Sequence, residues 1–146
     1  MSARPAELAA PGPLPTAAKL RLVGEILAAY RRVRRSLRVR SDITETLAAL
    51  RNGGPAGPAP TGEEAKAAGI RLGRAVSRTL RAVPADSRCL TQSLVLTTLL
   101  SRRGLGGALV IAVSPEEKFG AHAWVELEGC PLLPTGGGDY ARLVEL

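Results

Sequence analysis

Residues 88–100, with the sequence RCLTQSLVLTTLL, decide the fold of this 146-residue chain. They follow a turn signal at residues 84–87, are apolar with few polar interruptions, and run into Arg102, Arg103 and Gly104. Basic side chains followed by a glycine are typical of a helix end. The pattern therefore predicts a buried helix that begins at Cys89.

Cys89 is a candidate nucleophile because of its place in this helix. The first turn of a helix has backbone N–H groups without partners and lies at the positive end of the helix dipole. Both features favour the thiolate, which is the reactive form of a cysteine. The alternative is a small buried core residue, which is the role of most free cysteines.

One histidine in the chain could act as the base that such a nucleophile needs. His122 lies in residues 118–127, where the side chains alternate as in a strand and place His122, Trp124 and Glu126 on one face. A lone histidine on a strand is structural by default. However, the chain between Cys89 and His122 is long enough for a helix and a hairpin to bring them together, and a nucleophile and its base need be adjacent only in space.

Size and composition indicate one domain with a core of its own. The chain is 45% hydrophobic but only 3% aromatic, so leucine, valine, isoleucine and alanine must fill that core. The formal net charge is +7, and residues 1–53 carry ten lysine and arginine residues against four acidic ones. Such a surplus suits nucleic acid, an anionic membrane surface or an acidic protein, and does not choose among them.

The cysteine content and the apolar segments indicate a cellular compartment. Two cysteines are a poor disulfide framework, the N-terminus does not resemble a secretory signal, and no uncharged run is long enough to span a membrane. We expect a reduced, cytoplasmic protein.

The order of the remaining elements predicts an α+β fold. Residues 1–15 are expected to be a disordered tail, residues 16–60 to hold two helices and a flexible connector within the same domain, and residues 61–146 to form the core. Thr16 is expected to cap the first helix, and capping boxes at Asp42 and Thr61 to begin the next two. The buried stripe of the first helix is expected to comprise Leu20, Val23, Leu27, Tyr30 and Leu37.

Strands are expected within residues 105–113, 118–127, 130–133 and 140–146. Because short turns separate them, they should form an antiparallel meander packed on the cysteine helix.

Several of these segments together carry a resemblance to a known family. They are Cys89-Leu90, Ser93-Leu94, Leu99-Leu100, Arg102-Arg103-Gly104, residues 109–113, Phe119, residues 121–126 and Gly129. In order and spacing they resemble the transglutaminase-like leader peptidases of lasso-peptide biosynthesis, over about residues 65–146.

The resemblance implies a papain- or transglutaminase-type core in which Cys89 is the nucleophile and His122 the base. It implies removal of the leader from a ribosomally made precursor, so that a partner lasso cyclase can close the ring. It also implies that a separate leader-binding recognition-element protein docks on this stand-alone peptidase, and it calls for no cofactor or metal.

The chain departs from the family pattern at the group that would orient His122. The family has an aspartate twelve residues after the histidine, and this position is Pro134, whose side chain cannot orient an imidazole. Glu126 is too far along the strand to touch the ring. Asp139 is the best remaining carboxylate, and a backbone carbonyl or a water is the alternative.

Other residues are candidates for contacts with substrate or partner. Trp124, Phe119 and Ser93 are candidate substrate-binding residues, with core packing as the alternative for the two aromatic ones. Arg31, Arg34, Arg35 and Arg38 form a basic cluster that could dock the recognition-element protein or be a solvated helix face.

Three rival functions remain on the residues alone. A degenerate transglutaminase-like module could bind a peptide or partner with little or no catalysis, and Pro134 favours it. The basic helix could bind nucleic acid, although no accompanying motif supports this. Cys89, His122, Cys130 and Asp139 could hold a metal, although they lack the paired spacing of metal ligands. We expect neither of the last two.

Overall fold

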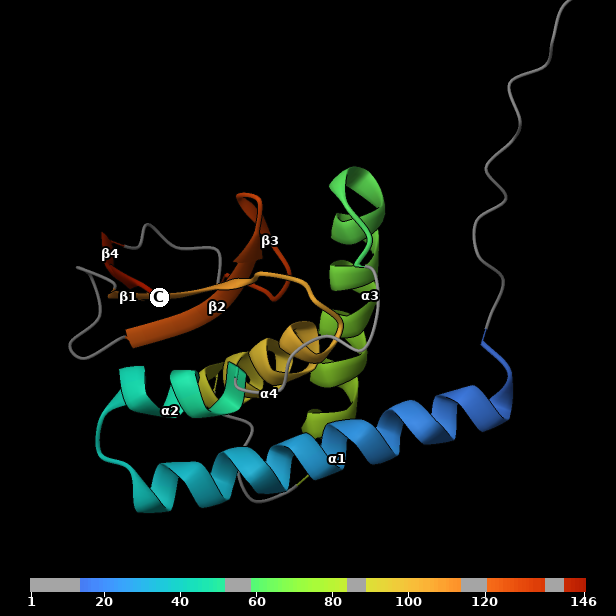
Figure 1. Ribbon diagram of the computed structural model, residues 1–146, viewed down its shortest axis with the longest axis horizontal. Helices are drawn as coiled ribbons and strands as arrows, with labels where there is room; N and C mark the ends of the chain where they lie inside the picture. Colours follow the sequence, from blue (N-terminus) through green and yellow to red (C-terminus); the bar gives the residue numbers. More distant parts are fainter. Residues whose placement is uncertain (1–13, 52–58, 84–88, 114–120, 136–140) are drawn as a thin grey trace, which may run out of the picture.

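The computed structural model describes residues 14–51, 59–83, 89–113, 121–135 and 141–146. Within these residues, four helices precede four strands (Figure 1). The elements are α1 (Thr16–Val39), α2 (Ile43–Arg51), α3 (Gly62–Arg81), α4 (Cys89–Arg102), β1 (Ala108–Val113), β2 (Ala121–Leu127), β3 (Cys130–Pro131) and β4 (Ala141–Glu145). The strands form one antiparallel sheet in the order β3-β2-β1-β4, which confirms the α+β prediction.

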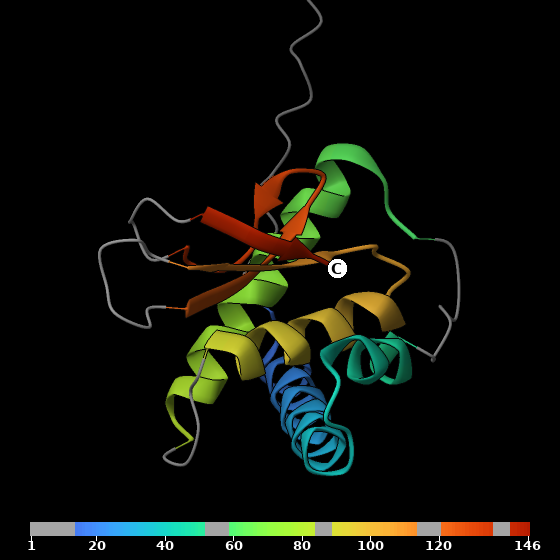
Figure 2. The same cartoon turned by 90° about the vertical axis from the view of Figure 1, so that its left-hand side faces the viewer.

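Helix α4 lies at the centre of the structure. The sheet lies on one side of it and α1 and α2 on the other, while α3 packs across it (Figures 1 and 2). Thr91 and every residue from 93 to 100 are buried, so the helix has no solvent-facing side over these turns. A helix that is apolar all round must be surrounded by other elements, as the sequence of residues 88–100 predicts.

The hydroxyl groups of α4 are satisfied within the helix itself. Ser93 donates to the Cys89 carbonyl at 2.7 Å, Thr97 to Ser93 at 2.8 Å and Thr98 to Leu94 at 2.8 Å. A buried hydroxyl without a partner would cost about 1–3 kcal/mol, so these bonds allow a polar sequence to occupy the core.

The end of α4 has the predicted glycine. Gly104 has a φ of 72°, which favours glycine. Its N–H donates to Ser101 and the N–H of Leu105 donates to Leu100, which is the Schellman pattern of a helix end.

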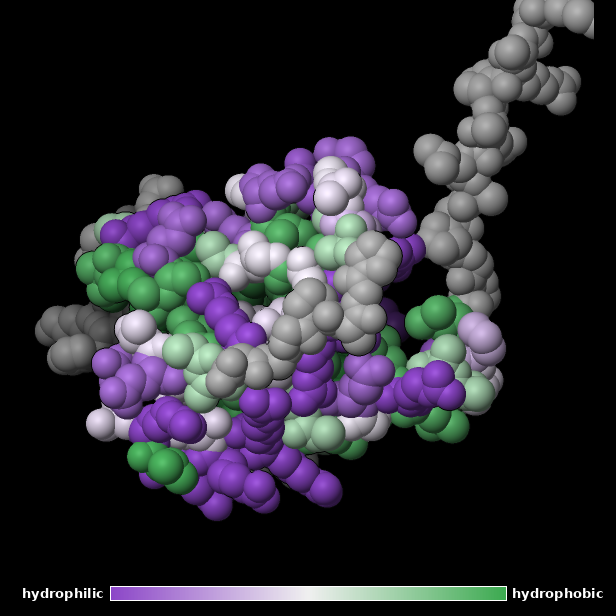
Figure 3. All heavy atoms as spheres, in the orientation of Figure 1, coloured by the Kyte–Doolittle hydropathy of each residue, from purple (hydrophilic) through white to green (hydrophobic). Residues whose placement is uncertain are grey.

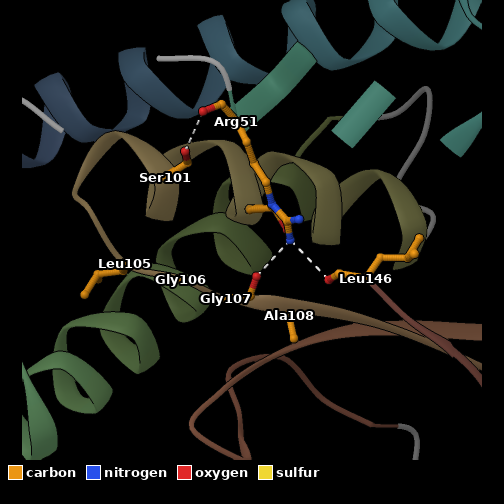
Figure 4. A pocket seen from close by; sticks show the side chains of 8 residues that line it. Arg51, Ser101, Leu105, Gly106, Gly107, Ala108 and Leu146 are labelled. Carbon is orange, nitrogen blue, oxygen red and sulfur yellow. Dashed lines mark hydrogen bonds between the residues drawn. The ribbon is translucent and has the colours of Figure 1, made fainter. Parts of the chain in front are cut away.

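Arg51 joins the helical half to the sheet. Its guanidinium donates to the carbonyls of Gly107 and Leu146, and its own carbonyl accepts a hydrogen bond from Ser101 (Figure 4). One side chain from α2 therefore holds the entry to β1 and the segment after β4 in place over the end of α4.

The buried stripe predicted for α1 was only partly right, because Tyr30 and Leu37 are half-buried against the core but are not its fully buried residues. The buried residues are Ile26, Ala29, Val33 and Ser36, whereas Leu20 is 68% exposed and Val23 is 38% exposed. The first half of α1 extends past α3 (Figure 1), so its apolar residues there have no helix to pack against. The second half packs on α4 and α3 through a neighbouring stripe of smaller side chains.

The predicted helix caps had different outcomes. The cap of α1 is Pro15, and Thr16 is the first helical residue. Thr61 is the cap residue of α3, as predicted, but its side chain makes no capping hydrogen bond. Asp42 does cap α2, because its carboxylate accepts a hydrogen bond from the Thr44 N–H at 2.8 Å.

Two glycines allow α3 to lie against the segment that follows β3. A Cβ at Gly69 would lie 2.9 Å from Cδ1 of Leu132, and a Cβ at Gly73 would overlap the carbonyl oxygen of Leu132. The contact at Gly73 is with backbone, which cannot rotate away as a side chain can. Gly73 therefore sets how closely α3 approaches residues 132–134.

We expect Gly73→Ala to lower the free energy of unfolding by about 2 kcal/mol or more, because the Leu132 backbone must move. Gly24→Ala is the matched control, since a Cβ there meets no atom within 4 Å in an exposed part of α1. It should raise stability by up to about 1 kcal/mol through helix propensity. Urea unfolding of both variants measures the difference, and equal effects would show that the close approach at Gly73 is unimportant.

Candidate active site

Cys89 is the first residue of α4 and is half-buried. The turn that it begins is held in two ways. Ser93 bonds back to the Cys89 carbonyl, and the hydroxyl of Ser77 on α3 lies 3.4 Å from Oε1 of Gln92. Helix α3 thus braces the turn from which the thiol projects.

His122 is the second residue of β2 and is also half-buried. Its Nε2 lies 2.9 Å from the carbonyl oxygen of Pro134. Because a carbonyl oxygen only accepts hydrogen bonds, this contact requires the proton on Nε2. In the neutral ring Nδ1 then carries the lone pair, and it is the nitrogen that can accept a proton from a thiol.

The contact with Pro134 comes from the position where the family pattern has an aspartate. The side chain of a proline cannot orient the ring, but its backbone carbonyl makes the contact. The segment is anchored close by, because the Leu132 N–H donates to Val125 on β2 at 2.8 Å and Gly73 admits the Leu132 backbone against α3. The contact to His122 is therefore made by a backbone held from two sides.

Cys89 and His122 lie on the same side of the molecule. The beginning of α4 lies beneath the beginning of β2 in both ribbon views (Figures 1 and 2). A cavity of about 260 Å³ lies close to this part of the molecule. Its lining includes Ser77, whose hydroxyl lies 3.4 Å from Gln92 in the first turn of α4, and Pro134, whose carbonyl contacts His122.

A larger cavity of about 380 Å³ lies elsewhere. Its lining includes Thr97 and Ser101, from the half of α4 that is remote from Cys89, together with the Arg51 guanidinium (Figure 4). Neither cavity is lined by Cys89 or His122, but the larger one adjoins the other end of α4, whereas the smaller one is lined by Pro134, which contacts His122.

Trp124 is a core residue. Substrate contact and core packing were the two roles expected for it, and the structure favours the second. It is 4% exposed, and its Nε1 donates to Oε1 of Glu126 at 2.9 Å. Arg142 of β4 holds the same carboxylate through two bonds, at 2.7 and 3.1 Å. The Trp124 ring centre lies 5.9 Å from that of His122, so this buried network supports the residue beside the histidine.

The prediction that Ser93 contacts substrate was also wrong. Its side chain is fully buried, and its hydroxyl is bonded to the Cys89 carbonyl. Ser93 thus supports the first turn of α4. Phe119 and Asp139 lie outside the described residues, so their predicted roles stay predictions.

The basic cluster lies on the second half of α1. Arg31, Arg35 and Arg38 are exposed, and Arg34 is half-buried with its guanidinium 5.9 Å from the centre of the Tyr30 ring. Hydrophilic side chains gather along this helix in the space-filling view (Figure 3). The position of these arginines leaves three of them open to a partner.

Two further observations concern cofactors and membranes. In the described part of the chain, no group of three or more histidine, cysteine, aspartate or glutamate residues is placed to hold a metal. None of the described helices is both long enough and apolar enough to cross a membrane.

Sequence reasoning named a backbone carbonyl as one possible orienting group without identifying Pro134 as its source, and it missed Ser77, Gln92 and Arg142. The family spacing of twelve residues pointed to position 134, but only the side chain of that residue was considered and not its carbonyl. Ala112 of β1 pairs with His122 of β2 on one side and with Arg142 of β4 on the other. That register, which includes a bulge between Ile111 and Ala112, has no signal in the sequence.

The Pro134 contact predicts the tautomer of His122. Long-range ¹H–¹⁵N correlation spectra of the neutral ring should show the proton on Nε2. If the Pro134 carbonyl is the orienting group, Asp139→Asn should leave this pattern unchanged. A proton on Nδ1, or a change of tautomer in the Asp139 variant, would contradict the carbonyl as the orienting group.

Comparison with known proteins gives the family. The curated proteins and the solved structures contain no match to the chain. A family profile described as the transglutaminase-like superfamily matches residues 27–145, which is most of the chain and includes α4 and the whole sheet. With a cysteine at the start of the central helix and a histidine on the adjacent sheet, this chain belongs to the transglutaminase-like superfamily.

Proposed function

We propose that this protein is a cysteine peptidase that removes the leader from a ribosomally synthesised lasso-peptide precursor. The observation that carries the proposal is the contact between His122 Nε2 and the Pro134 carbonyl, which makes Nδ1 the basic nitrogen. The resemblance of residues 65–146 to the leader peptidases adds the substrate, and membership of the transglutaminase-like superfamily supports thiol chemistry.

The proposed reaction begins with transfer of the Cys89 thiol proton to Nδ1 of His122. The thiolate attacks the scissile carbonyl carbon, and the backbone N–H of Cys89 at the helix start stabilises the oxyanion. The tetrahedral intermediate collapses with cleavage of the C–N bond while His122 protonates the leaving amine. Water, deprotonated by His122, then hydrolyses the thioester and restores the thiol.

The orienting carbonyl has a consequence for rate. A hydrogen bond to a neutral acceptor contributes about 0.5–1.5 kcal/mol, and a charged acceptor contributes roughly twice as much. The imidazolium formed during the reaction is therefore stabilised less by Pro134 than by an aspartate. A difference of about 1.4 kcal/mol would make the enzyme about tenfold slower than a relative with the carboxylate.

The same observation favours a second candidate, a transglutaminase-like module that binds a peptide or partner with little catalysis. In that case Cys89 has no need of activation. An electrophile such as iodoacetamide should then label Cys89 no faster than Cys130, which is also half-buried and lies on β3. Markedly faster labelling of Cys89 near neutral pH would argue against this candidate.

Removal of the nucleophile tests the proposal directly. With the precursor and the recognition-element protein from neighbouring reading frames, Cys89→Ala should abolish leader removal and Cys130→Ser should keep most of it. The reason is position, because Cys89 begins α4, which packs on the strand that carries His122, whereas Cys130 lies on β3. Mass spectrometry of the products measures both. Cleavage by Cys89→Ala would reject the mechanism, and equal losses in both variants would point to a shared structural role of the two cysteines.

We further propose that α1 docks the leader-binding recognition-element protein, which in turn presents the precursor before the cyclase acts. Arg31, Arg35 and Arg38 are exposed along the second half of α1, and Leu20 is exposed on its first half, where Figure 3 shows apolar surface. A basic stripe beside apolar surface suits an acidic protein partner.

Charge reversal tests this surface. Arg31→Glu with Arg35→Glu should weaken affinity for the recognition-element protein about tenfold or more, by loss of attraction and added repulsion. Arg102→Glu with Arg71→Glu makes the same change in net charge at exposed positions on other helices, and it should have little effect. Titration calorimetry of both pairs at two salt concentrations measures the affinities. Equal losses of affinity in the two pairs would show that the α1 arginines are a solvated helix face with no role in docking.

A further inference from the structure

Three arginines of α3 face the cavity beside the candidate active site. The residues that line it are Gly73, Arg74, Ser77, Arg78, Arg81, Leu132 and Pro134. Arg74, Arg78 and Arg81 follow one another at four- and three-residue spacing, so they form one stripe of the helix. The stripe lies opposite the segment whose carbonyl contacts His122.

The fold itself gives no reason for this stripe. All three side chains are exposed, and within the described residues none of them is in an ion pair or a hydrogen bond. Like charges four residues apart destabilise a helix by about 0.2–0.5 kcal/mol. Arg78 and Arg81 lie near the end of α3, where cations complement the helix dipole, but Arg74 lies a turn too early for that effect. An anionic ligand in the cavity would offset the repulsion among all three.

The shape and lining of the cavity limit this ligand. A volume of about 260 Å³ accommodates a side chain and a short piece of backbone. Leu132, Pro134 and Gly73 provide an apolar surface, and Ser77 provides a hydroxyl group. Guanidinium groups bind carboxylates through paired hydrogen bonds, which favours a carboxylate carried on a short aliphatic stem.

We propose that this cavity binds an aspartate or glutamate side chain of the peptide substrate, within about four residues of the scissile bond. The distance follows from Pro134, which both lines the cavity and contacts His122, and from the rise of about 3.3 Å per residue in an extended peptide. That the ligand belongs to a substrate rests on the proposed peptidase function, whereas binding of the carboxylate does not.

The first experiment measures binding without cleavage. The probes are N-acetyl-aspartate N-methylamide and its asparagine counterpart, which have nearly the same shape and differ in charge. Backbone ¹H–¹⁵N signals of residues 74–81 should shift on titration, with the aspartate probe binding at least about fivefold more tightly. Arg74→Gln with Arg78→Gln should remove this preference, while Arg71→Gln, exposed on the same helix but outside the cavity, should keep it.

Equal binding of the two probes, or no shift up to about 20 mM of the aspartate probe, would overturn the proposal. So would an equal loss of preference in Arg71→Gln, because that would indicate a general effect of positive charge. The substitutions are at exposed positions, and circular dichroism checks that each variant folds.

The second experiment measures cleavage. Each acidic residue within four positions of the cleavage site of the precursor is replaced by its amide, one at a time. One replacement should slow single-turnover cleavage about tenfold or more in the natural protein and have little effect in Arg74→Gln with Arg78→Gln. Lysine at that substrate position should restore cleavage by Arg74→Glu with Arg78→Glu.

The two experiments separate this inference from the peptidase proposal. A precursor that is cleaved, but whose acidic residues have no effect on rate, would reject the cavity as a substrate site and keep the peptidase. A precursor that is never cleaved, with the aspartate probe bound at α3, would reject the peptidase and keep the carboxylate site.

Discussion

The structure depends on the enclosure of α4. Over residues 93–100 the helix has no exposed side, so elements must cover it in every direction, and they do so with the sheet, α1, α2 and α3. Burial of its leucines and valines contributes on the order of 1.5–3 kcal/mol for each side chain. Enclosure is possible because Ser93, Thr97 and Thr98 return their hydroxyl groups to the helix backbone.

The site lies where this enclosure ends. Cys89 and Leu90 are only half-buried, because the covering layers stop at the first turn of α4. The contact that orients His122 comes from the same packing, since Gly73 lets α3 lie against the backbone of Leu132 and so helps to place the carbonyl of Pro134. The same residues therefore determine the stability of the fold and the geometry of the site. A change in the packing of α3 would shift the backbone around Leu132 and, with it, the carbonyl that contacts His122.

The sequence predicted those elements of the fold in which one residue pattern dominates. The uninterrupted apolar run, the glycine at 104 and the alternation of residues 121–127 identified α4, its end and β2. Prediction failed where patterns compete or where side chains do not decide. In α1 two neighbouring apolar stripes exist, and only tertiary contact selects the one with Ile26 and Val33. The role of residue 134 belongs to a carbonyl, which every amino acid has, so no residue type could reveal it.

A backbone carbonyl changes what the orienting group can contribute. Its position depends on the chain around residues 132–134 and not on a side-chain rotamer, and proline stiffens that chain because its φ is locked. The carbonyl thus fixes the direction of the ring, and the Trp124, Glu126 and Arg142 network lies beside it. Because a carbonyl is neutral, it stabilises the imidazolium that forms during the proposed reaction less than a carboxylate would. In the proposed peptidase the cost would appear in the chemical step, and the proposed carboxylate site at the arginine stripe of α3 would contribute to affinity for the peptide.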